Sequence, residues 1–211
     1  MDAATLQAKV YSGYNKAALR IGKVAAVFHP ADPLTPITTS TVSVNAAFTQ
    51  DFNFSKPNKY GNACWWCVAD GSRFAVGDYL RNADGTWFVA GKQHLLPILV
   101  VECNTTISVF RVTHDTANGA IGYGGDVAAN ETTLMAGWPA SVLQGTKGEK
   151  NPADLPQDER QSRWIILLPY YPGIVINADD IVTDNLNRRY IISGPELTDL
   201  GWRLTASLQG A

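Results

Sequence analysis

The feature that most constrains the fold of this chain is a repeat. Residues 76–90 (VGDYLRNADGTWFVA) align without a gap with residues 178–192 (ADDIVTDNLNRRYII), at an offset of 180 minus 78, or 102 residues. Both segments read as an acidic residue before an apolar strand, a polar turn, and a second strand that opens with an aromatic residue, Phe88 or Tyr190. This pattern is typical of a β-hairpin, so the sequence predicts the same hairpin twice.

A second match suggests where each copy begins. At an offset of 137 minus 22, or 115, three residues recur and a fourth position stays apolar: Gly22, Ala25, Val27 and Phe28 fall on Gly137, Ala140, Val142 and Leu143. Both copies are therefore expected to open with the same strand, with the second copy shorter in an intervening loop, where length changes cost little. The alternative is that two amphipathic hairpins resemble each other by chance in a β-rich chain.

Composition limits the size of the core and the class of partner. With 211 residues, 45% of them hydrophobic, the chain can bury one good core or two small ones. Lys and Arg number 17 against 19 for Asp and Glu, giving a net charge of -2. That balance provides no electrostatic attraction for phosphate backbones, so direct nucleic-acid binding is not expected.

The chain is expected to be soluble and to be made in a cytoplasm. Its longest apolar runs, such as residues 95–101 and 164–169, are too short to span a bilayer, and no secretory-type segment follows Met1. Three cysteines cannot all pair in disulfides, which agrees with a reducing compartment.

The pattern along the chain predicts a mainly β fold of two tandem small β-barrel or sandwich units with a short N-terminal helix. Apolar residues at helical spacing place the helix in residues 1–21, with Asp2 as its cap and Gly22 at its end. The first unit is assigned to residues 22–112, with about six strands, and the second to residues 135–211. A glycine-rich stretch, residues 113–134, is interpreted as the linker between them.

Three long connections are also expected. An exposed strand is predicted over residues 38–44, followed by a polar and aromatic loop over residues 45–60. Residues 145–163 are rich in charge and proline and are interpreted as a surface loop. Segments 30–60 and 113–134 exceed what connections inside small barrels need, so they are expected to reach neighbouring subunits.

Cys64 and Cys67 have the spacing of a redox pair or of half a zinc site. They lie in a segment of strand character, where side chains at i and i+3 point to opposite faces, and not at a helix start that would lower a thiol pKa. A zinc site would need further ligands, and only His94 and Cys103 are near in sequence. We therefore expect buried structural cysteines, with an oxidoreductase dependent on Cys64 and Cys67 as the enzymatic alternative.

No catalytic, cofactor-binding or metal-binding residue is predicted. The three histidines, at positions 29, 94 and 114, fall in different segments, and no nucleophile, zinc-protease or phosphate-loop motif is present in the sequence. Five acidic residues recur at hairpin positions and are interpreted as turn residues: Asp78, Asp84, Asp179, Asp180 and Asp184. Six tryptophans suit a core and subunit interfaces, and Trp164 aligns with Trp65 or Trp66 if a three-residue gap is allowed.

The last third of the chain resembles a known family. Residues 172–174 (PGI), 179–184 (DDIVTD), 188–192 (RRYII) and 200–204 (LGWRL) are similar to the head-closure or stopper proteins in the neck of tailed bacteriophages. Residues 76–89 give a second, weaker match. The likeness covers about 40 residues well, and tail-terminator and baseplate proteins contain similar hairpins. A single-barrel stopper would need about half of this chain, so a tandem version could have another symmetry or position.

The resemblance implies a virion protein that forms a ring joining head to tail around the DNA channel, with no catalytic residue. The expected partners are the chain itself, as a hexamer with a dodecamer as the alternative, and neighbouring portal, adaptor and tail proteins. Genomic DNA would pass without specific binding, and no membrane is involved. The alternative is a tail or baseplate adaptor that docks fibres.

Overall fold

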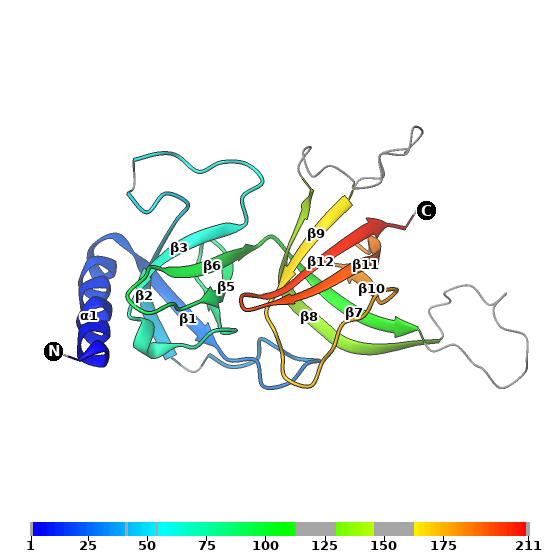
Figure 1. Cartoon of the computed structure of the whole chain (residues 1–211), viewed down its shortest axis with the longest axis horizontal. Coiled ribbons are helices and arrows are strands. Elements are labelled where there is room, and N and C mark those ends of the chain that lie inside the picture. The colour runs from blue at the N-terminus through cyan, green and yellow to red at the C-terminus, as the bar shows by residue number, and fades with distance from the viewer. Residues whose placement is uncertain (1, 41, 54, 113–129, 146–162, 210–211) are drawn as a thin grey trace, which may run out of the picture.

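The computed structural model describes residues 2–40, 42–53, 55–112, 130–145 and 163–209. In these residues, one α-helix precedes twelve strands, which close into two barrels side by side (Figure 1). The helix is α1 (Ala3–Ile21), and a short 3-10 helix, η1 (Gly71–Arg73), lies in the first barrel. The first barrel contains β1 (Lys23–Phe28), β2 (Val42–Thr49), β3 (Cys64–Ala69), β4 (Tyr79–Arg81), β5 (Thr86–Gly91) and β6 (Ile98–Cys103). The second contains β7 (Thr105–Val112), β8 (Glu131–Gln144), β9 (Arg163–Leu168), β10 (Ile181–Asp184), β11 (Arg189–Thr198) and β12 (Gly201–Leu208).

The two barrels have the same strand order. Around the first barrel the strands run β1-β2-β3-β6-β5-β4, and around the second they run β7-β8-β9-β12-β11-β10, with antiparallel pairing throughout. Closure leaves neither sheet with a free edge. The predicted mainly β fold of two tandem barrels with an N-terminal helix is therefore confirmed, with six strands in the first unit.

A bulge recurs at the same place in both barrels. The ladder between β5 and β6 shifts between Val89 and Gly91, and the ladder between β11 and β12 shifts between Ile192 and Gly194. A bulge adds local twist and bends the strand, which helps a short sheet to close. Its recurrence extends the likeness of the units from strand order to backbone detail.

The boundary between the units differs from the prediction. β7 was assigned to the first unit, but it pairs with β8 and β10 in the second barrel, so that barrel starts at Thr105 and not at residue 135. Only Asn104 separates β6 from β7. The predicted linker, residues 113–134, is no linker between units: residues 113–130 connect β7 to β8 within one barrel, and residues 131–134 begin β8. Residues 113–129 lie outside the described residues.

The second match of the sequence, at offset 115, is wrong for the same reason. Gly137 and the residues after it lie in β8, which occupies the place of β2, whereas the counterpart of β1 is β7. The two glycines also have different roles. Gly22 ends α1 with extended backbone, and Gly137 has a φ of 67° within a strand that bulges against β7.

The repeated hairpin is confirmed on its first strand and is offset by one residue on its second. Backbone N–H groups of Val89 and Ile192 donate to the carbonyls of Asp78 and Asp180 respectively, so Val89 corresponds to Ile192 at an offset of 192 minus 89, or 103. The turn is one residue longer in the second barrel, because Asn82 N–H donates to Gly85 whereas Asp184 N–H donates to Arg188.

Phe88 and Tyr190 therefore lie on equivalent strands but at different positions. Tyr190 corresponds to Trp87, and both side chains point into their barrels. Phe88 points outward, where it packs with Tyr79 against the second barrel, with ring centroids 6.3 Å apart. A one-residue difference in turn length thus changes which face an aromatic residue covers.

α1 lies at the end of the first barrel that is farther from the second barrel (Figure 1). Asp2 caps it by accepting a hydrogen bond from Thr5 N–H at 2.8 Å. Its apolar side packs on β2, β3 and η1, with Ala18 fully buried. A Cβ on Gly71 would lie 2.5 Å from the Tyr11 ring, so glycine at this position allows the close approach of the helix. The helix predicted over residues 1–21 is confirmed.

The predicted strand over residues 38–44 and the loop over residues 45–60 are wrong in their boundary. β2 continues to Thr49, and Ala46 and Ala47 are buried. The prediction ended the strand at Asn45, but a polar residue on the outer face of a barrel strand does not interrupt the backbone ladder.

A layer of buried side chains joins the two barrels. Tyr79 on the outside of the first barrel is fully buried, and its hydroxyl donates to Pro139 of β8 at 2.8 Å. The loop after β1 crosses to the second barrel, where the Pro33 carbonyl accepts from Trp138 Nε1 at 2.6 Å and from Ala136 N at 3.0 Å. Full burial of an aromatic side chain contributes about 1.5–3 kcal/mol, so these contacts hold the barrels as one body.

Candidate functional site

The two cysteines of the 64–67 pair are free thiols in different environments. Cys67 is fully buried in the first barrel and Cys64 is exposed, so their side chains point to opposite faces of β3, as predicted. The expectation that both cysteines are buried is wrong for Cys64, because only one face of a barrel strand lies in the core. Burial raises the pKa of the Cys67 thiol far above its ordinary value, and it also raises the pKa of Cys103. Because the thiolate is the reactive form, these two buried thiols are poorly suited to exchange chemistry.

The other residues considered for metal binding do not converge. His94 is exposed in the connection after β5, and the Cys103 thiol donates to the Val101 carbonyl. Within the described ranges, no three His, Cys, Asp or Glu side chains are grouped closely enough to hold a metal ion. His29 pairs with Asp78, and His114 lies outside the described residues.

Two of the predicted turn aspartates have a further structural role. Asp78 and Asp180 are only 4% and 3% exposed. Each carboxylate accepts a hydrogen bond at 2.7 Å from the backbone N–H three residues earlier, Ala75 in the first barrel and Asn177 in the second. Each therefore closes a tight turn before its strand, which agrees with the predicted turn chemistry.

The same two carboxylates also bind a basic side chain from the neighbouring strand. His29 Nδ1 lies 2.6 Å from Asp78 Oδ1, just after β1. Arg111 near the end of β7 donates from Nε and Nη2 to Asp180 at 2.9 and 2.7 Å. The registers equate Phe28 with Phe110, so His29 and Arg111 are equivalent residues of the repeat. The likeness of residues 27–29 (VFH) to residues 109–111 (VFR) could have revealed from the sequence that His29 and Arg111 are equivalent.

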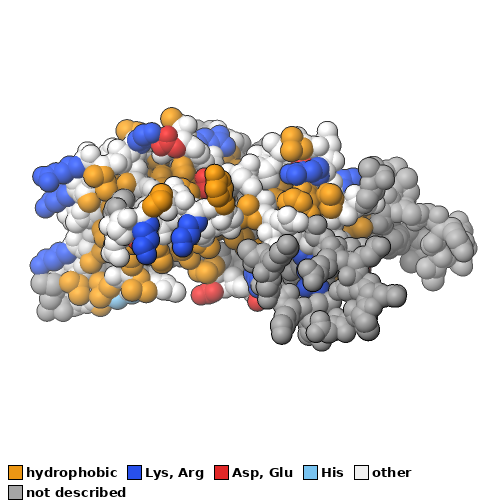
Figure 2. Space-filling model, turned by 90° about the horizontal axis from the view of Figure 1, so that it is seen from above, with side chains coloured by type: hydrophobic (Ala, Val, Ile, Leu, Met, Phe, Trp, Pro, Cys, Tyr) orange, Lys and Arg blue, Asp and Glu red, His pale blue; other side chains and the backbone are white. Residues whose placement is uncertain are grey.

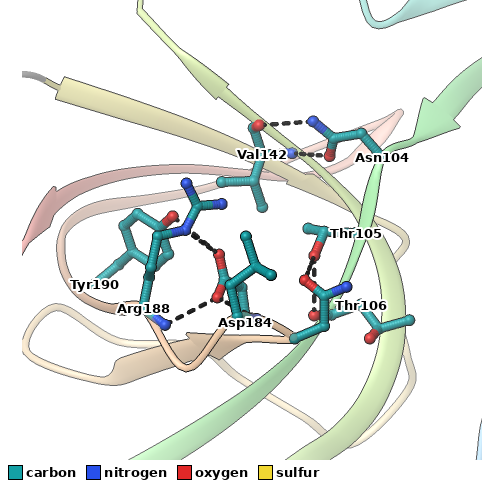
Figure 3. Close-up of polar contacts among 9 residues, drawn as sticks. Asn104, Thr105, Thr106, Val142, Asp184, Arg188 and Tyr190 are labelled. Atoms are coloured by element: carbon teal, nitrogen blue, oxygen red, sulfur yellow. Dashed lines mark hydrogen bonds and ion pairs between the residues drawn. The ribbon is translucent and has the colours of Figure 1, made fainter.

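Asp184 is the centre of the densest polar network in the described part of the second barrel (Figure 3). Its buried carboxylate accepts from the Leu186 and Arg188 N–H groups at 2.9 Å, from Arg188 Nε at 2.7 Å, and from the Tyr190 hydroxyl at 3.1 Å. Desolvation favours the neutral acid, but the hydrogen bonds together outweigh it and lower the pKa of Asp184. Desolvation and the nearby Asp184 charge raise the pKa of Tyr190 to about 12.

This network shapes the hairpin turn and presents no reactive group. The Arg188 guanidinium lies 5.5 Å from the Trp164 ring centroid and 5.9 Å from that of Tyr190, in cation–π contact. At the same end of the barrel, Thr105 donates to the Asn185 side chain at 2.7 Å. The equivalent contact in the first barrel is the exposed ion pair of Lys23 and Asp84 at 2.6 Å. The turn is thus attached to the first strand in both barrels.

Aromatic packing repeats as well. Trp65 pairs with Val100 and Trp164 pairs with Ala206, and the common register makes the two tryptophans equivalent, as the sequence predicted. Trp65 packs edge-on against Trp87 at 6.3 Å, and Trp164 packs edge-on against Tyr190 at 5.5 Å. Five of the tryptophans, including the buried Trp138 and Trp202, therefore pack in or against the core clusters. Trp66 is the exception, and its ring packs edge-on against Phe52 at 6.5 Å.

Among the exposed apolar side chains of the described residues, we consider two groups as candidates for assembly. The first is the outward side of α1, where Leu6, Leu19 and Ile21 are exposed beside basic residues. The second is a groove of about 220 Å³ between the barrels, which we call the inter-barrel groove. Its lining includes Val76, Tyr170, Leu197, Asp199 and Leu200.

The described residues contain no helix with the length and apolar character that crossing a bilayer requires. Comparison of the chain with protein-family models, with curated proteins and with solved structures returned no match.

Proposed function

We propose that this chain is a structural protein of a tailed-phage virion, made in the host cytoplasm, which forms a ring in the neck that joins head to tail around the DNA channel. It would act as a head-completion, stopper or collar protein and would have no catalytic role. Its partners would be further copies of itself, the portal or adaptor on one side, and tail proteins on the other.

The observation that carries the proposal is the pair of equivalent barrels held as one body. Along the chain, a single residue, Asn104, links the last strand of the first barrel to the first strand of the second. The hydrogen bonds of Tyr79 with Pro139 and of Trp138 with Pro33 then fix one barrel against the other. A stiff subunit with apolar side chains on two separate outer surfaces suits a ring that must stay closed while DNA passes.

The resemblance of residues 172–204 to stopper proteins gives independent support. This segment contributes β10, β11 and the first part of β12, three strands that follow one another around the second barrel. The net charge of -2 supports a channel lining that lets a polyanion slide and does not hold it.

Electron microscopy of virions tests the proposal. A short epitope placed after residue 209 would be labelled with antibody-bound gold, and the gold is expected at the junction of head and tail. Gold at the tail tip would instead support the alternative of a baseplate adaptor for fibres. Infected cells that contain the protein while purified particles lack it would contradict both virion roles.

A further inference from the structure

The outward side of α1 is a basic stripe. Lys9, Lys16 and Arg20 follow one another at spacings of seven and four residues, which places them on one side of a helix. All three are exposed, and none of them forms an ion pair within the described residues. Figure 2 shows Lys and Arg side chains projecting from the α1 end of the molecule. α1 itself contains no acidic residue.

Apolar side chains border the basic stripe. Leu6 lies three residues before Lys9 and is 41% exposed, and Leu19 lies three residues after Lys16 and is 62% exposed. Ile21 is 58% exposed at the end of the helix. A partner that gains from this surface must therefore offer both negative charge and apolar area, since exposed leucines gain nothing from phosphates alone.

The inter-barrel groove offers that combination. Val76, Tyr170 and Leu197 at its rim are 50%, 48% and 51% exposed, and Leu200 is 37% exposed. Asp199 lies among them, exposed and without an ion pair in the described part of the chain. The groove is thus an open apolar surface with a free carboxylate.

The net charge of the helical segment differs in sign from that of the rest of the chain. Residues 1–21 contain three Lys or Arg and one Asp, a net charge of +2, so the remaining residues carry -2 minus 2, or -4. Of this -4, residues 113–129 and 146–162, which lie outside the described residues, carry -2 and -1, so the described body carries -4 plus 3, or -1. On the described surface, the charge that complements the basic stripe of α1 is therefore the Asp199 carboxylate in the groove of another copy.

We propose that α1 of one copy docks over the inter-barrel groove of the next copy, with its basic stripe beside Asp199 and its leucines against the apolar rim. The two surfaces lie in different places on the molecule: α1 is at one end (Figure 1), and the groove is lined by residues of both barrels. A contact between different surfaces leaves a free α1 and a free groove at each step, and it closes only as a ring. The inference deepens the proposed ring, but it concerns the purified chain and can be tested apart from virions.

Three variants test the docking by sedimentation. The first reverses the stripe with Lys9→Glu, Lys16→Glu and Arg20→Glu. The second removes apolar contact from the groove with Tyr170→Ser and Leu197→Ser, where both side chains are about half exposed, so folding is preserved. The matched control reverses three exposed cations elsewhere, Lys56→Glu, Lys59→Glu and Arg163→Glu, with the same change in net charge. Circular dichroism confirms that each variant is folded.

The wild-type chain and the control are expected to form a closed oligomer, whereas the stripe and groove variants stay monomeric, with self-association weaker by about 100-fold. Mixing the two monomeric variants should give a dimer that grows no further, because one supplies an intact groove and the other an intact α1.

A mixture that stays monomeric would overturn the proposal, as would a control as deficient as the stripe variant. A wild-type chain that stays monomeric but binds duplex DNA through Lys9, Lys16 and Arg20 would also overturn it and would identify the partner as nucleic acid. Gold labelling away from the neck would refute the proposed function and leave the docking result intact.

Discussion

His29 in the first barrel occupies the position of Arg111 in the second, and each binds the buried aspartate that begins the repeated hairpin. The two pairs differ in strength. Arg111 is always charged and binds Asp180 through two nitrogens, whereas His29 has one contact and its side chain is 65% exposed.

Arg111→Ala is therefore expected to destabilise the chain more than His29→Ala. Loss of Arg111 leaves the buried Asp180 carboxylate without its cation, at a cost of about 3 kcal/mol, while the His29 variant costs about 1 kcal/mol. Urea unfolding at neutral pH measures both. If the two variants lost the same unfolding free energy, the prediction that the Arg111–Asp180 pair is the stronger one would be wrong.

Asp184→Asn should destabilise the second barrel in a pH-dependent manner. The pKa of Asp184 is lowered from its ordinary value of 3.8, so the ionised group stabilises the fold above that pH, and this contribution disappears as the pH falls through the lowered folded-state value. At neutral pH the variant should lose about 2 to 3 kcal/mol, and the difference from wild type should shrink under strong acid. Asp84→Asn, at an exposed turn, is the control with little effect.

Gly71→Ala should weaken the packing of α1 on the first barrel of its own chain, because the new methyl group would lie 2.5 Å from the Tyr11 ring. Overpacking of this kind costs about 1 to 3 kcal/mol. Gly13→Ala is the matched control, since nothing lies within 4 Å of a Cβ there and alanine favours a helix by about 1 kcal/mol. Thermal unfolding and tryptic cleavage after Lys9 report the two effects, which should have opposite signs.

The cysteines should differ in reactivity and in their effect on stability. A thiol reagent is expected to modify Cys64 in the native chain and to leave Cys67 unmodified until it unfolds. Cys67→Ser should cost about 1 to 3 kcal/mol because it buries a hydroxyl, whereas Cys64→Ser should have no measurable effect. Thiol exchange activity that disappears in the double variant would restore the oxidoreductase alternative.

The sequence predicted the repeated hairpin because strand alternation and turn chemistry are local properties. The same locality explains the error of one residue at Phe88 and Tyr190, since an extra turn residue leaves the alternation of each strand intact while it shifts the pairing. The boundary between barrels was missed because a single residue, Asn104, carries no compositional signal. The boundary was placed instead at the glycine-rich segment, which connects β7 to β8 within the second barrel.

The pair of His29 with Asp78 depended on contacts that local patterns do not contain, since 49 residues separate them. Asp184 was recognised as a turn residue, but its contacts come from Arg188 at the end of the turn and from Tyr190 on the next strand. Periodicity indicates which residues turn inward, whereas only the closed barrel determines which side chains meet there.

Asn104 has a mechanical consequence. Its side-chain amide donates to the Val142 carbonyl and accepts from the Val142 N–H, both at 2.9 Å, so it continues the ladder of β7 as a peptide group would. The joint between the barrels is therefore a rung of the sheet and not a hinge. A twisting load applied to one barrel would turn the whole subunit, and two copies could not exchange a barrel without first breaking β6 or β7 out of its sheet.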